Sequence, residues 1–196
     1  MKSLVVCVSV SHGNTRKVAK AIAGSIGAEV IDPGQRRPAE VTGYDLLGLG
    51  SGIYGMTFHP RLWRFAAGLP DGHGTPVFLF ATSGGGRIWW QPASLLLTRM
   101  LRGKGYRVVD TFSCPGFDTW LPLRLVGGLN KGRPSAADLD AARRFGDQLR
   151  RHVAEPEARP APSAPRERAP RAPRAPRRRP APAATDRSRP AQPTSN

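Results

Sequence analysis

The chain has 196 residues, of which 39% are apolar, and a formal net charge of +16 at neutral pH. This length favours one domain, or one domain with an appendage, and two cysteines are too few for a disulfide framework. No apolar run is long enough for a signal sequence or a membrane span, so we expect a soluble cytoplasmic protein with no integral membrane segment.

The first 153 residues alternate between apolar runs and helical patterns. Predicted strands cover 3–8, 29–31, 45–49, 76–81 and 106–112, and predicted helices cover 15–26, 60–67, 92–102 and 135–152. Strands that alternate with helices indicate a parallel sheet covered on both faces, which is an α/β fold. Ligands of such sheets bind beyond the carboxyl ends of the strands.

The turn after the first strand has the composition of an anion site. Hydroxyl groups, a glycine and the free amides of a starting helix come together there, and all of them favour a phosphate. The residues concerned are Ser9, Ser11, His12, Gly13, Asn14 and Thr15. Two alternatives remain open, namely that the segment is an ordinary capped turn and that His12 faces solvent instead of donating to a phosphate.

Three further strand ends carry glycine, hydroxyl or aromatic groups. After the third strand, the sequence predicts a glycine-rich turn in which Tyr54 either stacks on a flat ring or covers the core. The fourth strand ends in hydroxyls and glycines, followed by Trp89 and Trp90. Cys114, after the fifth strand, is either a small buried residue or a reactive thiol. The four histidines and two cysteines show no spacing typical of metal ligands.

These loops, taken in order, resemble those of the flavodoxin family, in particular a small flavodoxin-like branch found in bacteria and archaea. The resemblance covers roughly residues 1–152. It implies a three-layer sandwich around a five-stranded parallel sheet in the order 2-1-3-4-5. It also implies a non-covalently bound FMN that passes one or two electrons. The runs 112–119 and 127–134 are typical of that branch, although no role is assigned to them.

The resemblance also assigns the cofactor-binding residues. Ser9, Ser11, Gly13, Asn14 and Thr15 would hold the phosphate, and His12, which replaces the family's common threonine, is a candidate second donor. The isoalloxazine ring would lie against Tyr54, with Ser51, Gly52, Ile53 and Gly55 around it. The ribityl and pyrimidine side would contact Thr82, Ser83, Gly84 and Gly85. A second stacking partner is unassigned, with Trp89 as the candidate.

Three functions remain open at this stage. The first is electron transfer in redox metabolism, with an unidentified redox protein or a small-molecule electron donor or acceptor as partner. The second is an FMN-dependent oxidoreductase of the NAD(P)H:quinone or protoporphyrinogen type. The third is a flavodoxin-like scaffold without flavin whose tail binds polyanions. The basic body distinguishes the chain from acidic electron carriers, whose docking depends on charge complementarity.

Residues 154–196 form a predicted disordered tail. From residue 155 onward this tail contains 11 of the 20 prolines and no aromatic, leucine, isoleucine or valine residue. Such a composition cannot bury enough apolar surface to offset the entropy of ordering. Its net charge of +6 leaves +10 for the body. The tail is therefore either a solvated extension or a weak, salt-sensitive contact for polyanions.

Overall fold

The computed structural model describes residues 1–10, 12–84, 87–117 and 130–154. Ser11, Gly85 and the predicted tail from residue 155 onward lie outside the described residues, as do the side chains of residues 87–89. The predicted boundary between domain and tail therefore stays a prediction.

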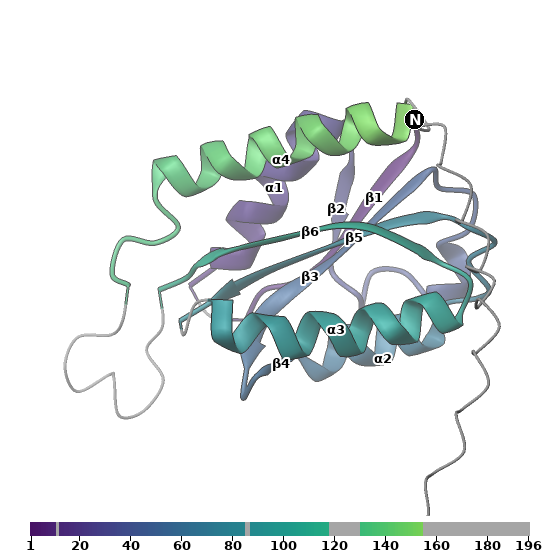
Figure 1. The fold of residues 1–196 in the computed structure, drawn as a ribbon, viewed down its shortest axis with the longest axis horizontal. Coiled ribbons are helices and arrows are strands. Elements are labelled where there is room, and N and C mark those ends of the chain that lie inside the picture. Colours follow the sequence, from purple (N-terminus) through teal and green to yellow (C-terminus); the bar gives the residue numbers. More distant parts are fainter. Residues whose placement is uncertain (11, 85–86, 118–129, 155–196) are drawn as a thin grey trace, which may run out of the picture. The chain divides into compact units, whose positions relative to one another are not determined.

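The described residues form a parallel sheet between two pairs of helices (Figure 1). Its strands lie in the order β2-β1-β3-β5-β6, and a short strand, β4, pairs antiparallel with β3. The strands are β1 (Ser3–Val8), β2 (Glu29–Ile31), β3 (Leu46–Tyr54), β4 (Thr57–Phe58), β5 (Pro76–Ser83) and β6 (Arg107–Pro115). Without β4, the order is the predicted 2-1-3-4-5, so the predicted fold is confirmed with one addition.

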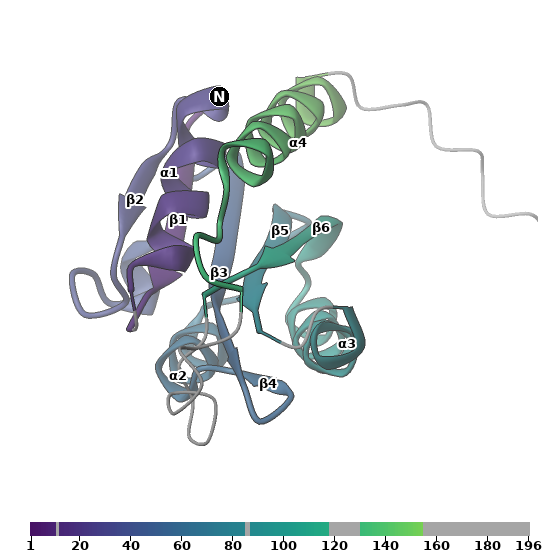
Figure 2. The ribbon, with the colours of Figure 1, turned by 90° about the vertical axis from the view of Figure 1, so that its left-hand side faces the viewer.

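The helices cover the sheet in two layers. They are α1 (Asn14–Ile26), α2 (Pro60–Gly68), α3 (Arg87–Gly103) and α4 (Ala136–Ala154), with a 3-10 turn at Pro38–Glu40. Helices α1 and α4 lie together on one face, and α2 and α3 lie on the other (Figures 1 and 2). No helix in the described part of the chain is both long enough and apolar enough to cross a membrane.

Alternation along the strands divides the core between these layers. In β1, Leu4, Val6 and Val8 join the cluster under α2 and α3, whereas Val5 and Cys7 join the cluster under α1 and α4. Both clusters are fully enclosed, which explains why β1 reads as a continuous apolar run.

The third strand differs from its prediction. It continues to Tyr54, so the segment predicted as a glycine-rich turn after residue 49 is mostly strand. The reason lies in the neighbouring strand, because Gly48 and Gly50 pair with Phe78 and Phe80 of β5. A Cβ atom at Gly48 would lie 2.3 Å from the Phe78 ring, and one at Gly50 would lie 2.4 Å from the Phe80 ring. These glycines make room for rings, not for a bend.

The third helix also differs, because it begins at Arg87 and not at Pro92. Proline usually marks the first turn of a helix because it lacks an amide proton. Here Pro92 lies inside α3, past the first turn. Strands β5 and β6 run to Ser83 and Pro115, beyond the predicted ends at residues 81 and 112.

The glycine–phenylalanine packing leads to a stability prediction. Gly50→Ala should lower the free energy of unfolding by about 1–3 kcal/mol, because the new methyl group overlaps the Phe80 ring. Gly24→Ala is the matched control, since Gly24 lies in α1 with nothing within 4 Å of its Cβ position. That control should gain up to about 1 kcal/mol from helix propensity. Urea unfolding measures the free energy of unfolding of both variants. An equal increase in Gly50→Ala and Gly24→Ala would contradict the close contact between Gly50 and Phe80.

Candidate functional site

The candidate site lies where the parallel strands end. Figure 2 looks onto this edge, from which α1 starts after β1, the β3–β4 hairpin projects, and β5 and β6 run out. Every described residue that the sequence predicts to bind a cofactor lies in one of these segments. The prediction of the site's place therefore agrees with the fold, whereas the role of each residue depends on its contacts.

The turn between β1 and α1 leaves the N-terminus of α1, the positive end of the helix dipole, without a side-chain cap. His12 and Gly13 both have left-handed backbones, with φ of 54° and 67°, and Gly13 precedes the first helical residue. The first turn of α1 contains no acidic residue. The amide of Arg16 donates to Ser9 Oγ at 3.3 Å, which leaves the Ser9 hydroxyl proton available to an acceptor. The leading amides of α1, which have no acceptor within the helix, can therefore bind an anion.

The side chains of Asn14 and Thr15 brace this turn from inside the protein. Both residues are buried. Asn14 Nδ2 donates to the carbonyl oxygen of Phe117 at 2.8 Å, and the hydroxyls of Thr15 and Thr82 lie 2.8 Å apart. Both side chains thus bond to protein groups and hold the helix start in place, while the amides of both residues remain as donors for a phosphate.

The ends of β5 and β6 are joined by a segment to which the sequence assigns no role. The Gly116 amide donates to the Ser83 carbonyl at 3.2 Å. Asn130 Nδ2 donates to the carbonyls of Gly84 at 3.2 Å and Gly116 at 3.4 Å. Asn130 has a φ of 58°, a backbone conformation that asparagine tolerates better than most residues. Asn130 and Phe117 lie in the two runs typical of the flavodoxin-like branch, which is the signal that could have located them.

Phe117 also contacts the phosphate-loop candidate. Its ring centroid lies 4.6 Å from that of His12, at an interplanar angle of 50°. His12 therefore packs on the segment that follows β6. Sequence reasoning weighed only a phosphate donor and a solvent-facing residue, and it missed this contact.

The β3–β4 hairpin presents Tyr54 at the edge. Gly55 and Met56 form its two-residue turn with φ of 53° and 62°, the pattern of a tight hairpin. The Tyr54 side chain is 40% exposed, and its ring covers Gly52, whose Cβ position lies 3.0 Å from it. The ring also meets His59 edge-on, with centroids 5.5 Å apart. The partly exposed Tyr54 ring thus lies at the carboxyl edge of the sheet. The neighbouring Ile53 side chain, by contrast, is buried in the core.

Ser51 has a structural role in this hairpin. It is fully buried, its hydroxyl donates to the Gly52 carbonyl at 2.7 Å, and it accepts from the His59 amide at 3.0 Å. These bonds tie the end of β3 to the start of α2, so the Ser51 side chain is not directed at a ligand.

His59, which the sequence did not single out, caps α2 behind Tyr54. Its Nδ1 accepts from the Arg61 amide at 3.1 Å. Burial lowers the pKa of His59 below its ordinary value, and the positive charges of Arg61 and Arg64 lower it further, against a smaller opposing effect from Asp32. The imidazole is therefore neutral at neutral pH, as its capping bond requires.

The two cysteines are buried and free. Burial raises the pKa of Cys7 and of Cys114 to about 12 in each case. Cys114 is thus the small buried residue and not the reactive thiol of the two alternatives. Trp90 likewise belongs to the core, where it meets Phe58 edge-on with centroids 5.6 Å apart. The side chain of Trp89 lies outside the described residues.

Comparison with known proteins places this geometry in a family. No family model matches the chain. An uncharacterised protein of Methanocaldococcus jannaschii is 32% identical over 149 residues, which cover 76% of this chain and 98% of that protein. A flavodoxin from the domain Archaea superposes with a TM-score of 0.59 at 21% identity, covering 79% of this chain and all of the other. Flavodoxin 2 from Bacillus cereus superposes with a TM-score of 0.58 at 18% identity, and the match covers 74% of this chain and 95% of that flavodoxin. The chain belongs to the flavodoxin-like family.

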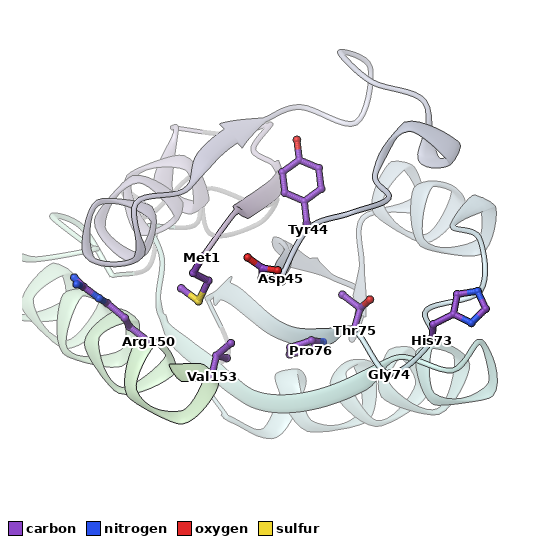
Figure 3. A pocket seen from close by; sticks show the side chains of 9 residues that line it. All are labelled: Met1, Tyr44, Asp45, His73, Gly74, Thr75, Pro76, Arg150 and Val153. Atoms are coloured by element: carbon purple, nitrogen blue, oxygen red, sulfur yellow. The ribbon is translucent and has the colours of Figure 1, made fainter. Parts of the chain in front are cut away.

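The flavodoxin-like chain also has an open pocket of about 590 Å³ at the opposite edge of the sheet (Figure 3). It is lined by Met1, by Tyr44 and Asp45 before β3, by residues 73–76 before β5, and by Arg150 and Val153 of α4. The Lys2 amide donates to Asp45 at 2.6 Å, and Lys2 Nζ lies 4.6 Å from the centre of the Tyr44 ring. None of the lining residues is a predicted cofactor residue, so the candidate site remains at the carboxyl edge.

The hydrogen bond between Thr15 and Thr82 predicts that substitutions at the two residues have non-additive effects on stability. Thr15→Val or Thr82→Val should each lower the free energy of unfolding by about 1–3 kcal/mol, because each leaves the other buried hydroxyl without its partner. The double variant should lose clearly less than the sum, since neither hydroxyl then remains. Denaturant unfolding of the four proteins measures the cycle, and strictly additive losses would contradict the bond.

A second prediction concerns the start of α4. Arg133 donates to both carboxylate oxygens of Asp138 at 2.8 Å, and the Ser135 amide donates to Asp138 Oδ2 at 2.7 Å. Burial alone would raise the pKa of Asp138, but the hydrogen bonds from Arg133 and Ser135 outweigh it and hold that pKa below its ordinary value. The ionised carboxylate therefore stabilises the folded state above the pKa of the unfolded chain.

Asp138→Asn should accordingly destabilise the protein most at neutral pH. The difference in unfolding free energy from the parent should shrink as the pH falls below about 4, because the unfolded parent chain then takes up a proton on Asp138 before the folded protein does. Unfolding curves of both proteins across this range measure the difference. Asp147→Asn on α4, an exposed position, serves as a control with little expected change. A difference that stayed constant with pH would contradict the role of the charge.

Proposed function

We propose that this protein binds FMN at the carboxyl edge of its sheet and acts as a flavin redox protein. Its partner would be a redox protein or a small-molecule electron donor or acceptor. The observation that carries the proposal is the pairing of an open helix start, behind the left-handed residues His12 and Gly13, with the exposed Tyr54 ring on the neighbouring hairpin. One of these suits a phosphate and the other suits a flat ring, and family membership supports the combination.

The residues at the start of α1 suit the phosphate group of FMN. The amides at the start of α1 and the Ser9 hydroxyl supply donors, and Arg16 adds a positive charge in the first helical turn. A Cβ atom at Gly13 would meet nothing within 4 Å, so the backbone there is open to a ligand. An anion at this place gains from both the unpaired amides and the helix dipole.

The ring end fits as well. Tyr54 offers an exposed aromatic face, and the contact with His59 supports its orientation from behind. Thr82 and Ser83 are buried at the end of β5, so ligand contacts in that region would come from the backbone. FMN, when bound, supplies the exchange of one or two electrons, while the protein orients it and sets its electrostatic surroundings.

The cations near Tyr54 affect that electrostatic setting. Arg61 and Arg64 are close enough to His59 to lower its pKa, and His59 touches the Tyr54 ring. Positive charge near a flavin favours its reduced, more negative form. The reduction potentials should therefore be less negative than those of an acidic carrier, which redox titration of the loaded protein would measure.

The direct test uses the full chain. Purified protein, before and after addition of FMN, should show the visible absorption of bound flavin and quenched flavin fluorescence. Titration with riboflavin separates the two halves of the proposal, because riboflavin lacks the phosphate. We expect FMN to bind more tightly than riboflavin. Absence of binding by both ligands would overturn the proposal.

A variant in the phosphate turn sharpens the test. Ser9→Ala should weaken FMN binding roughly tenfold or more through loss of a hydrogen bond to a charged group, and should leave riboflavin affinity nearly unchanged. Ser94→Ala, on α3 and away from the edge, is the matched control and should alter neither. Equal losses for FMN and riboflavin in Ser9→Ala would instead indicate general damage to the turn.

A further inference from the structure

The outer surface of α3 carries two exposed leucines. Trp90, Ala93, Leu97 and Leu101 form the buried stripe of this helix, with the spacing of one helical face. Leu95 and Leu96 lie outside that stripe and are 69% and 59% exposed. These two adjacent leucines give an otherwise amphipathic helix a small apolar area on its outer side.

The charges around these leucines have one sign. Arg99 and Arg102 follow Leu95 at helical spacings of four and seven, which places all three on the same outward stripe. Both arginines are exposed, and neither forms an ion pair with another described residue. Neither α2 nor α3 contains an aspartate or glutamate. The outward stripe of α3 therefore combines an exposed leucine with two arginines that pair with no described acidic residue.

The β3–β4 hairpin lies on the same side of the sheet as α3. Phe58 of β4 packs against Trp90 of α3, and the β3–β4 hairpin projects from the sheet on the side of α2 and α3 (Figures 1 and 2). Leu95, Leu96, Arg99 and Arg102 together are called the α3 surface below.

We propose that the α3 surface binds the interface of an anionic lipid membrane. Arginines at the headgroup level gain from the negative surface potential, and leucines beside them insert into the acyl boundary. Helix α3 would lie along the membrane without crossing it. The inference concerns membrane association alone and does not depend on a bound flavin.

A membrane suits this surface better than an acidic protein does. A stable protein interface buries about 800 Å² on each partner, with a packed apolar centre, and two leucines cover far less. Insertion into lipid needs no complementary pocket. The charge of the chain is also spread widely, with +16 in total, of which +6 lies in residues 155–196. An extended anionic surface attracts such a molecule as a whole, and the exposed leucines then select the face that inserts.

A site-specific fluorescence experiment tests the face. Leu95→Cys in the full chain is labelled with an environment-sensitive dye, which should react selectively because Cys7 and Cys114 are buried with raised pKa values. Lys20→Cys, on exposed α1 across the sheet, is the matched control. Vesicles of phosphatidylcholine and phosphatidylglycerol in equal parts should shift the dye at residue 95 to the blue, and lipid-borne quenchers should quench it. The dye at residue 20 should respond to neither.

Vesicle partitioning of unlabelled variants tests the energetics. Leu95→Ser with Leu96→Ser should lower partitioning of the full chain onto the anionic vesicles about tenfold or more. Arg99→Gln with Arg102→Gln should lower it roughly tenfold, more than the charge-matched Lys17→Gln with Lys20→Gln on α1. The parent chain and all of these variants should bind only weakly to vesicles of phosphatidylcholine alone.

Three results would overturn the proposal. One is an equal response of the dyes at residues 95 and 20. Another is unchanged partitioning of the leucine variant, which would assign the attraction to overall charge, the tail or an acidic protein. The third is an equal loss from both charge-matched pairs. Circular dichroism of each variant confirms that it is folded, which these exposed positions favour.

Discussion

The candidate site depends on a set of buried hydrogen bonds between the start of α1 and the ends of β5 and β6. Asn14 binds the carbonyl of Phe117, and Thr15 binds Thr82, so two consecutive helical residues fasten the helix to β5 and to the segment that follows β6. These polar side chains are enclosed, and such groups strongly restrict which arrangement of their partners is stable. The positive end of α1 is thereby held at the edge, with its amides facing outward. The left-handed residues His12 and Gly13 lead directly into this fastened helix start.

The sequence specified the fold well where the apolar pattern was continuous. Strands 3–8 and 29–31 match β1 and β2, and the capping pair Ser135 and Asp138 correctly marked the start of α4. It failed where a residue's meaning depends on a partner strand. Glycine in β3 was taken for a turn signal, but Gly48 and Gly50 face phenylalanines some 30 residues later. A local pattern cannot contain that pairing, because it arises only when β3 and β5 become neighbours.

The same limit applies to the site. Composition alone located the rim, because glycine and hydroxyl residues after parallel strands collect at one edge. It could not separate side chains that face a ligand from those that hold the edge together. Ser51, Asn14, Thr15 and Thr82 have the residue types of ligand contacts, yet their side chains bond to the protein. Conversely, His59 and Asn130 lie outside the expected loops and reach the site through tertiary contacts.

The two proposed surfaces are separable within this architecture. The site residues lie on turns at the carboxyl edge, whereas Leu95 and Arg99 lie more than two helical turns beyond the start of α3 at Arg87. Their side chains face away from the core stripe that fixes α3 on the sheet, so removing them leaves the packing of Trp90 and Leu97 intact. Helix α3 connects the two, because it begins directly after the turn that follows β5, where Thr82 and Ser83 lie, and its exposed leucines come about two turns later.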